Sequence, residues 1–296
     1  MKYSFVAQHK KTWPIDVMCH VLGVRRNGFY RFVKQQKRSS DDKRHQEMLE
    51  WVKDIGESSD FTYGSRRMRA ALEALGYPVC RETAAKLMKE AGIAVRHRKK
   101  YKVTTNSNHQ QPVYSNVVKR EFDVKEPDQV YASDITYIWT QEGWLYLAVV
   151  IDLFSRKVVG WSMGTRMQAK LVCDALSMAI GLRHPKPGLI HHSDRGSQYA
   201  SKAFADLLNR NEFIGSMSRK GDCWDNAVVE SFFGSLKQER VQWRNYQTRY
   251  EAQQDILNYI TMFYNAWRLH SHLGYKSPSD YEKEKAVTES EMRKAA

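Results

Sequence analysis

Apolar positions recur at helical spacing at the start of the chain. The first stripe consists of Ile15, Met18, Cys19 and Leu22. Gly23 follows it, and glycine is typical just beyond a helix end because it adopts a positive φ at little cost. Basic and aromatic residues then continue at helical spacing from Arg25 to Phe32. The pattern predicts a helix–turn–helix over residues 13–36.

Residues 43–92 repeat this pattern at a larger scale. The predicted helices cover Lys43–Glu57, a segment that follows Tyr63-Gly64, and Arg81–Ala91. Gly76-Tyr77-Pro78 separates the second helix from the third, and Gly92 ends the third. Short helices around glycine turns, rich in arginine, are typical of domains that lay a helix in the major groove of DNA.

From Asp128 onward the pattern changes to strands alternating with helices. Strands are predicted over Val130–Trp139, Trp144–Leu153, Lys157–Ser162, Gly188–Ser193 and Phe213–Met217. Helices are predicted over Gln168–Leu182, Ser201–Arg210, Asn226–Glu239 and Arg249–Trp267. Short links favour antiparallel pairing of the first three strands, and the apolar second strand is expected to be buried on both faces. In the last helix, Ile256, Ile260, Phe263 and Trp267 are expected to share one face.

This order predicts an α/β fold of the ribonuclease-H-like type, a five-stranded mixed sheet flanked by helices, preceded by all-α helix–turn–helix segments. The expected parts are an N-terminal helix–turn–helix segment (1–40), a helix–turn–helix DNA-binding domain (41–94), a basic linker (95–127), a ribonuclease-H-like domain (128–284) and a charged tail (285–296). We expect the chain beyond Glu284 to fray.

Composition excludes a membrane protein. Apolar residues make up 42% of the chain and charged residues 27%, an ordinary globular mixture. The longest apolar run, Trp144–Ile151, is far short of the roughly 20 residues that cross a bilayer. The N-terminus has no signal pattern, so we expect a soluble, cytoplasmic protein. Four widely spaced cysteines predict reduced thiols rather than a zinc site.

Net charge is +14, and most of it lies in the front of the chain. Residues 1–127 hold 26 Lys/Arg against 14 Asp/Glu, whereas residues 128–296 hold 21 against 19. A basic front half favours binding to DNA phosphates, although a merely cationic soluble protein would share this balance. The candidate DNA contacts in this half are Arg66, Arg67, Arg81, Lys86, Arg96, Arg98, Lys99 and Lys100.

Three carboxylates stand in settings that suit metal-dependent chemistry. Asp134 lies in the middle of a predicted strand, Asp194 at the end of another, and Glu230 in a helix. Phosphodiester cleavage commonly uses two cations about 3.5–4 Å apart, and hard Mg²⁺ or Mn²⁺ prefers oxygen ligands. Each residue alone could instead be a buried hydrogen-bonded Asp, a turn former or an exposed helical Glu.

Taken together, these residues resemble a known family. The matching motifs are Tyr63-Gly-Ser-Arg-Arg, Asp134-Ile-Thr-Tyr-Ile, Gly143-Trp-Leu-Tyr-Leu-Ala-Val-Val-Ile-Asp-Leu-Phe-Ser-Arg, His192-Ser-Asp-Arg-Gly-Ser-Gln-Tyr, Asp225-Asn-Ala-Val-Val-Glu-Ser-Phe-Phe and Tyr264-Asn-Ala-Trp-Arg-Leu-His. They resemble the DDE transposases of the retroviral-integrase superfamily, specifically the second-reading-frame products of insertion sequences in the IS-three group. The 35 residues between Asp194 and Glu230, and a Lys seven positions after the Glu, are part of that pattern. Helix–turn–helix segments stand where retroviral integrases carry a His/Cys zinc module.

The resemblance implies that Asp134, Asp194 and Glu230 are the catalytic metal ligands. They would hold two Mg²⁺ ions per site, with Mn²⁺ as a substitute. The implied activity is metal-dependent cleavage and strand transfer at the terminal inverted repeats of a bacterial insertion sequence, through a copied circular intermediate. Implied partners are double-stranded DNA, further copies of the chain on paired DNA ends, and an upstream-frame protein. The implied location is the bacterial cytoplasm, at the nucleoid.

Further residues around this motif have competing interpretations. Lys237, Asn226 and Lys220 are candidate DNA contacts, and Trp224 could join Lys220 in touching flanking DNA. Asp225 suits a helix N-cap, and Asp152 suits a structural role beside a hairpin. His191 and His192 could pack in the core, or His192 could support the metal ligands or the substrate.

Two other classes of protein compete with the transposase interpretation. Gly160-Trp-Ser162-Met-Gly164 matches the nucleophile elbow of serine hydrolases, but the preceding strand is predicted in an antiparallel meander. A DNA-binding regulator with an inactive catalytic domain would bind DNA without cutting it. A metal-dependent cleavage assay separates this regulator from the transposase. A nuclease of ribonuclease-H type is a milder variant, which would cut without rejoining.

Overall fold

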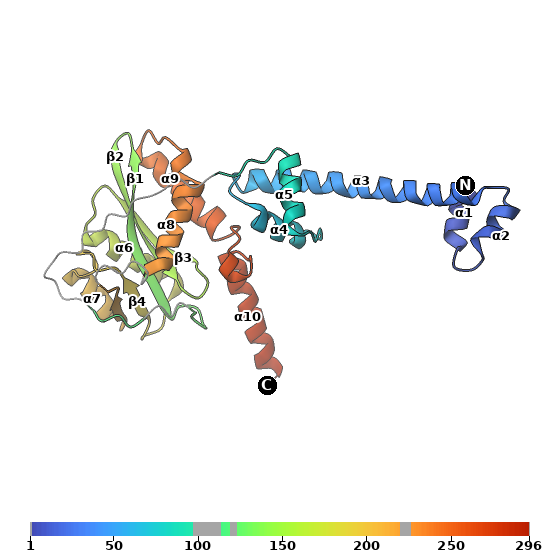
Figure 1. Cartoon of the computed structure of the whole chain (residues 1–296). Helices are drawn as coiled ribbons and strands as arrows, with labels where there is room; N and C mark the ends of the chain where they lie inside the picture. Colours follow the sequence, from blue (N-terminus) through green and yellow to red (C-terminus); the bar gives the residue numbers. More distant parts are fainter. Residues whose placement is uncertain (1, 97–113, 119–122, 220–225, 296) are drawn as a thin grey trace. The chain divides into compact units, whose positions relative to one another are not determined.

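A computed structural model describes residues 2–96, 114–118, 123–219 and 226–295, except for the side chains of residues 35–42 and 289–295. The chain forms two compact units, Met1–Val95 and Arg96–Ala296. Figure 1 shows a wholly helical first unit and a second unit built on a twisted sheet. The change of pattern near Asp128 therefore reflects a real change of architecture.

The first unit is built around one long helix. Its helices are α1 (Lys2–His9), α2 (Ile15–Val21), α3 (Arg26–Ser58), α4 (Ser65–Ala74) and α5 (Arg81–Glu90). The two separate helices expected between Arg25 and Glu57 are therefore wrong, because α3 runs through both. No glycine or proline lies between residues 29 and 55, so nothing in the sequence ends the helix there. The apolar pattern did not predict helix α1.

Two small apolar cores stabilise this unit. Val6, Met18 and Phe29 join α1 and α2 to the N-terminal part of α3. A second cluster joins α4 and α5 to the C-terminal part of α3, and consists of Val52, Met68, Leu72, Ala84, Leu87 and Met88. The second core has the three helices that the apolar stripes predicted, whereas the first gains the unpredicted α1, and α3 serves both cores.

The second unit contains the predicted five-stranded mixed sheet. Its strands are β1 (Val130–Thr140), β2 (Gly143–Asp152), β3 (Val158–Gly164), β4 (Ile190–Ser193) and β5 (Ile214–Met217). Their spatial order is β3-β2-β1-β4-β5. The first three strands pair antiparallel, whereas β4 pairs parallel with both β1 and β5. The ribonuclease-H-like expectation is confirmed.

Helices cover both faces of this sheet (Figure 1). Helices α6 (Ala169–Arg183) and α7 (Lys202–Arg210) pack on one face. Helices α8 (Ala227–Glu239) and α9 (Arg249–Asn258) pack on the other. Alternate residues of β2 enter the two cores, Val149 on one side and Val150 on the other. This double burial explains why the second strand is almost entirely apolar.

The C-terminal part differs from prediction at two places. After α9 the chain forms a π-helical turn, η3 (Tyr259–Tyr264), rather than continuing as a regular helix to Trp267. A π turn shifts the facing of every later residue, so Ile260 is buried while Trp267 is 73% exposed. The structure also corrects the expected frayed tail, because helix α10 (Pro278–Ala295) runs through it.

Part of the expected linker belongs to the second unit. Ser115 and Val117 hydrogen-bond along β5, the latter by donating its backbone N–H to Ser216 Oγ at 2.9 Å. Val118 is buried in the core on the α8 side of the sheet. The sequence did not indicate this segment, because it is short and only one of its side chains is deeply buried.

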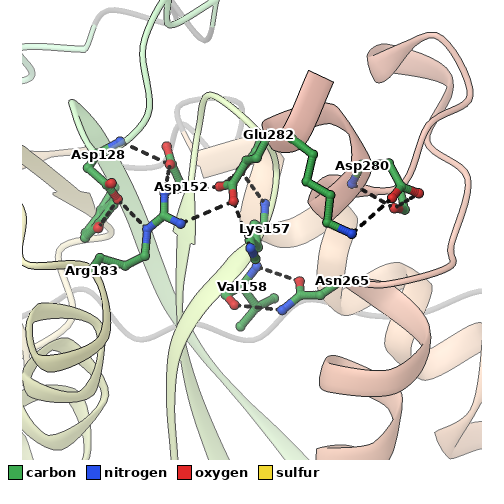
Figure 2. Close-up of polar contacts among 12 residues, drawn as sticks. Asp128, Asp152, Lys157, Val158, Arg183, Asn265, Asp280 and Glu282 are labelled. Carbon is green, nitrogen blue, oxygen red and sulfur yellow. Dashed lines mark hydrogen bonds and ion pairs between the residues drawn. The ribbon is translucent and has the colours of Figure 1, made fainter. Parts of the chain in front are cut away.

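A polar clasp fastens α10 to the sheet (Figure 2). The Arg183 guanidinium at the end of α6 bonds Glu282 at 3.1 Å and Asp128 at 2.8 Å. Lys157 at the start of β3 bonds the other Glu282 oxygen at 2.8 Å. Asn265 exchanges two hydrogen bonds with the backbone of Val158, at 3.0 and 2.9 Å, and so continues the edge of β3. The motif that begins at Tyr264 is thereby tied to the sheet edge.

The geometry of Ser162 excludes a nucleophile elbow at that position. Ser162 lies inside β3 and pairs with Ala148 of β2. It is therefore not at a sharp strand-to-helix turn, which the hydrolase motif requires. Gly160 has a packing explanation instead, since a Cβ there would lie 2.3 Å from the Ala175 carbonyl oxygen of α6.

No described helix has both the length and the apolar character needed to span a bilayer.

Candidate active site

Sheet register brings two of the three candidate carboxylates together. Ser133 of β1 pairs with Ser193 of the parallel strand β4. Asp134 and Asp194 are the next residues along these two neighbouring strands. Neighbouring strands of a sheet lie about 4.8 Å apart. Asp194 follows the carboxyl end of β4, where ligand sites of α/β sheets form. This parallel pairing brings together Asp134 and Asp194, which are 60 positions apart in the sequence.

Helix α8 carries the third carboxylate over the same strand. Glu230 lies in its first turn. Val229 and Phe232 pack in one core with Ala132 of β1, and Asn226 Nδ2 donates to the Ser133 carbonyl at 3.3 Å. These contacts fix the start of α8 beside Asp134. The three acidic residues that the sequence singled out therefore lie near the middle of β1, where its pairing with β4 ends.

The charges of the neighbouring side chains act on the Asp134 carboxyl. Burial, and then the neighbouring charge of Asp194, raise the pKa of the Asp134 carboxyl well above its ordinary value. Glu230 raises it further, whereas Lys237 lowers it. The Ile135 backbone N–H also lowers it by donating to Asp134 Oδ1 at 2.7 Å. Burial raises the pKa of Glu230 as well. Asp134 therefore responds to all three of its predicted partners.

A tight turn holds the Asp194 carboxylate. Its Oδ1 accepts the backbone N–H of Gly196 at 2.8 Å. A Cβ at Gly196 would lie 2.9 Å from that same oxygen, so a side chain here would push the carboxylate away. The Asp-Arg-Gly motif is thus explained by close approach of the backbone.

Lys237 lies two helical turns after Glu230 on the same face of α8. It is only 8% exposed, and its Nζ is 5.0 Å from the centre of the Tyr137 ring. Burial lowers the pKa of the Lys237 ammonium to about 8, while the negative charge of Asp134 acts in the opposite direction. A cation beside Asp134 is well placed to hold a phosphate.

The two histidines before Asp194 are core residues. His191 Nε2 shares a hydrogen bond with Ser133 Oγ at 2.8 Å. Burial lowers the pKa of His191 to about 3, so its ring is neutral at physiological pH. His192 bonds Ser216 Oγ at 2.9 Å and Ser218 Oγ at 3.3 Å. Both side chains thus link β4 to the neighbouring segments of the sheet unit.

The sequence alone assigned no role to Tyr199, the last residue of the motif that begins at His192. It is 1% exposed, and its hydroxyl has no hydrogen-bond partner among the described residues. Burial raises the Tyr199 pKa, and the charges of Asp134 and Asp194 raise it further. Rings of His191 and Phe204 hold it in place. Its only sequence signal was its position five residues after Asp194.

The side chains gathered here have the chemistry that a hard divalent cation requires. Three carboxylates supply oxygen ligands, and their mutual repulsion is relieved when a cation binds. Asn226 adds a buried amide oxygen, Oδ1, that has no partner in the described chain. Among the described residues, no three acidic, histidine or cysteine side chains are already arranged as a metal cage. Metal binding therefore requires the side chains to converge.

The basic candidates of the first unit lie on α4 and α5. Arg66, Arg81 and Lys86 are exposed. Arg67 lies over the Tyr63 ring at 5.5 Å. Arg81 Nε donates to Ser65 Oγ at 3.4 Å, so the starts of the two helices adjoin.

The remaining candidates fall elsewhere. Arg96 belongs to the second unit, where it donates to the Glu239 carbonyl at 3.0 Å and lies over Trp243. Those outside the described residues are Arg98, Lys99, Lys100, Lys220, Trp224 and Asp225.

Two other charged groups have structural roles. Asp152 is fully buried and accepts the backbone N–H groups of Phe154 and Asp128, at 3.0 and 3.1 Å. Burial raises its pKa to about 7. Arg268 makes a two-pronged pair with Glu239 at the end of α8, with both distances 2.7 Å. That pair explains the arginine of the motif that begins at Tyr264, which the sequence could not assign.

Comparison with protein families matches both units. The model described as "HTH-like domain" covers residues 43–101. Two models described as "Integrase core domain" cover residues 124–223 and 230–285. The helical unit and the sheet unit thus have separate relatives, and the integrase models span all three carboxylates.

Full-length relatives are also similar. The chain is 41% identical over 283 residues to "Transposase InsF for insertion sequence IS3A" of Escherichia coli (strain K12), which covers 95% of this chain and 98% of the relative. It is 42% identical over 265 residues to "Insertion element IS600 uncharacterized 31 kDa protein" of Shigella sonnei, covering 89% and 97%. Among solved structures, a magnesium complex of the HTLV-2 integrase catalytic core domain has a TM-score of 0.41 and 17% identity, covering 53% of this chain and 97% of that one.

Proposed function

Because this chain belongs to the IS3 family of insertion-sequence transposases, whose work is DNA transposition, we propose that Asp134, Asp194 and Glu230 are its catalytic metal ligands. The family makes the chain a polynucleotidyl transferase. The observation that supports the specific assignment is the electrostatic coupling of Asp134 to Asp194, Glu230 and Lys237.

The ligands are proposed to hold two Mg²⁺ ions, with Mn²⁺ as a substitute. When bound, such a pair activates the attacking oxygen and stabilises the leaving oxygen of a phosphodiester. The chain itself supplies rigid placement. The Ile135 and Gly196 N–H groups orient two of the carboxylates, and the packing of α8 orients the third. Lys237 holds a DNA phosphate beside them.

The proposed reaction has two displacements at phosphorus. Water first cuts a strand at a terminal inverted repeat of the element and leaves a 3′-hydroxyl. That hydroxyl then attacks a second phosphodiester, so neither step requires a covalent bond between protein and DNA. The exposed Arg66, Arg81 and Lys86 of the helical unit bind the phosphates of the repeat.

We propose that two or more copies assemble on paired ends, in the bacterial cytoplasm at the nucleoid. A circular copy of the element is the proposed intermediate. An upstream-frame protein of the same element is a further proposed partner.

Strand transfer with labelled inverted-repeat ends tests this function. Wild type is expected to cut and join in Mg²⁺ and to bind without cutting in Ca²⁺. Asp134→Asn, Asp194→Asn and Glu230→Gln should each bind DNA yet neither cut nor join. Binding without any cutting by the wild type would favour the inactive regulator, and cutting without joining would favour the nuclease.

The matched control is Asp174→Asn. Asp174 is an exposed acidic residue of α6 that pairs with Lys170 on the surface. Its neutralisation should leave both reactions unchanged, because α6 covers the face of the sheet opposite to α8. Normal cleavage by any of the three site variants would contradict the assignment.

A further inference from the structure

The N-terminal end of α3 belongs to a small helical module to which the proposed function gives no role. Helices α1 and α2 pack on this end of α3 through the buried side chains of Val6, Met18 and Phe29 (Figure 1). We call residues 2–34 the N-terminal module. It precedes the segment 43–101 that the HTH-like family model covers, so its function has to be inferred from its own residues.

The connection between α2 and α3 has the form of a helix–turn–helix. Helix α2 ends at Val21 and α3 begins at Arg26, so that only residues 22–25 join them. Gly23 in this turn has a φ of +62°, which glycine adopts at little cost. In DNA-binding proteins with this motif the second helix enters the major groove, and residues near its N-terminus contact the base edges. The second helix here is α3.

Close packing of α1 determines which face of α3 is covered. A Cβ at Gly28 would clash with the Tyr3 hydroxyl, so α1 lies directly against α3 at this glycine. The Tyr3 ring also lies 5.8 Å from the ring of Phe32. Phe29 is buried in the core of the module. Positions 28, 29 and 32 therefore define the packed face of α3.

The opposite face of α3 carries a row of polar side chains. Asn27, Tyr30, Arg31 and Lys34 have the spacing i, i+3, i+4 and i+7, which places side chains on one face of a helix. All four residues are exposed. At roughly 3.6 residues per turn, this row points away from the packed face. We call these four residues the α3 polar stripe.

The charge of the module favours a nucleic acid as the partner of this stripe. Residues 2–34 contain seven Lys/Arg and one acidic residue. That acidic residue, Asp16, pairs with Arg26 at 3.1 Å, which offsets part of its charge. A surface with so large an excess of cations attracts DNA phosphates at long range and repels basic protein surfaces.

We infer that the α3 polar stripe reads bases in the major groove, with Asn27 and Arg31 as the side chains that contact base edges. The Asn27 amide offers the donor and acceptor that match adenine, and the Arg31 guanidinium offers two N–H donors that match guanine O6 and N7. This inference rests on the proposed function, since it identifies the DNA that is read as the terminal inverted repeat. The exposed cations of α4 and α5 contact phosphates, which carry no sequence information directly.

Fluorescence anisotropy with two labelled duplexes tests the inference. One duplex carries the inverted repeat, and the other carries the same base pairs in scrambled order. Divalent cations are left out, so that no strand is cut. Wild type should prefer the repeat. Asn27→Ala and Arg31→Ala should each lose about 5- to 150-fold of affinity for the repeat, the range expected for one two-pronged base contact, and little for the scrambled duplex.

The variant Arg31→Lys separates base reading from phosphate binding. Lysine keeps the positive charge but cannot form the two-pronged contact with guanine that arginine forms. Arg31→Lys should therefore bind the scrambled duplex as wild type does and lose most of the preference for the repeat. A residue that only bound phosphate would retain the preference after this substitution.

Lys53→Ala and Asn209→Ala are the matched controls. Lys53 is an exposed cation of α3 beyond the N-terminal module, and Asn209 is an exposed amide of α7 in the sheet unit. Neither substitution should change the ratio of the two affinities. Circular dichroism and thermal melting confirm that every variant folds, which is expected because the stripe is exposed.

Methylation interference on the repeat identifies the base that is read. Methylation of guanine N7 removes the acceptor that the Arg31 guanidinium is proposed to contact. At least one guanine whose methylation weakens binding by wild type should therefore have no such effect on Arg31→Ala. This readout compares positions within one duplex, so a general loss of affinity cannot produce it.

Four results would overturn the inference: a wild type without preference for the repeat, variants that keep the wild-type ratio of affinities, equal losses on both duplexes, or the same methylation pattern in Arg31→Ala as in wild type. None of these measurements requires cleavage. A wild type that reads the repeat through the stripe but never cuts it contradicts the proposed function and leaves this inference intact. A wild type that cuts and joins while its stripe variants keep their preference does the reverse.

Discussion

At the scale of single residues, Asp134 lies where its surroundings oppose ionisation. Burial and two neighbouring carboxylates raise its pKa, whereas Lys237 and one backbone N–H lower it. Burial of an ionised carboxylate in such a strand costs free energy unless the carboxylate is paired with a cation or a hydrogen-bond donor. The sequence could indicate this position, because Asp134 is the one charged residue in strand β1. It could not indicate Tyr199, whose importance depends on a missing hydrogen bond.

Lys237 is predicted to make DNA binding depend on pH. Its pKa of about 8 means that the ammonium is charged below that pH and loses its charge above it. Affinity for the inverted repeat should therefore fall as pH rises from 7 to 9. Lys237→Gln should bind about 10-fold more weakly at pH 7, the loss of one charge-assisted contact, and lack this decline.

Anisotropy titrations at several pH values measure the effect. The exposed Lys202, which pairs with Asp206 on α7, gives the control variant Lys202→Gln. Parallel pH profiles for wild type and Lys237→Gln would contradict the role of Lys237.

Tyr199→Phe is predicted to stabilise the protein. The buried hydroxyl has no partner in the described chain, and an unsatisfied buried polar group costs about 1–3 kcal/mol. Its removal should raise the free energy of unfolding by that amount in denaturant titrations. Tyr131→Phe should have the opposite effect, because the equally buried Tyr131 hydroxyl donates to Asp128. A loss of stability in Tyr199→Phe would show that the hydroxyl has a partner.

At the scale of elements, strands and helices of the second unit could be predicted closely because periodicity and burial agree. Predicted and observed strand boundaries differ by at most two residues, as in β4, which starts at Ile190 rather than Gly188. The errors arose where no local signal exists. Helix α3 is continuous because no glycine or proline between residues 29 and 55 ends it. The π turn at Tyr259–Tyr264 depends on packing against α8 and the sheet.

The variant Glu282→Ala tests how much the clasp between α10 and the sheet contributes to the free energy of unfolding (Figure 2). Glu282→Ala leaves the partly buried Arg183 and Lys157 without this shared carboxylate. The expected loss is about 2 kcal/mol of unfolding free energy, between the values for exposed and fully buried pairs. Thermal or denaturant unfolding measures it.

The comparison for Glu282→Ala is Asp174→Ala. It breaks the exposed Lys170–Asp174 pair and should cost less than about 0.5 kcal/mol. Similar losses for the two variants would show that the clasp contributes no more than a surface pair.

At the scale of the whole molecule, the chain divides its work between two units. The helical unit of Met1–Val95 presents exposed cations on α4 and α5, and the sheet unit contains the carboxylates. The uneven distribution of charge along the sequence predicts this division. Composition could not predict that residues 114–118 pack on β5, because so short a segment gives no periodic signal.

The helical unit is predicted to supply salt-dependent affinity. Arg66→Ala and Arg81→Ala should each weaken binding of the inverted repeat and reduce the slope of log affinity against log salt by about 1, the effect of one lost phosphate contact. Neither should change the cleavage rate at saturating DNA, because both lie outside the carboxylate unit. Unchanged salt slopes would place the phosphate contacts elsewhere.

The most direct test of the carboxylate site is a switch of metal preference. Asp134→Cys, Asp194→Cys and Glu230→Cys each replace an oxygen ligand by sulfur, which Mg²⁺ binds poorly and softer metals bind better. Cleavage of labelled inverted-repeat ends is predicted to disappear in Mg²⁺ for all three variants and to return in part in Mn²⁺ for at least one, while Asp174→Cys cuts normally in both metals. Undiminished cleavage in Mg²⁺ by any of the three would contradict the assignment of that residue as a metal ligand.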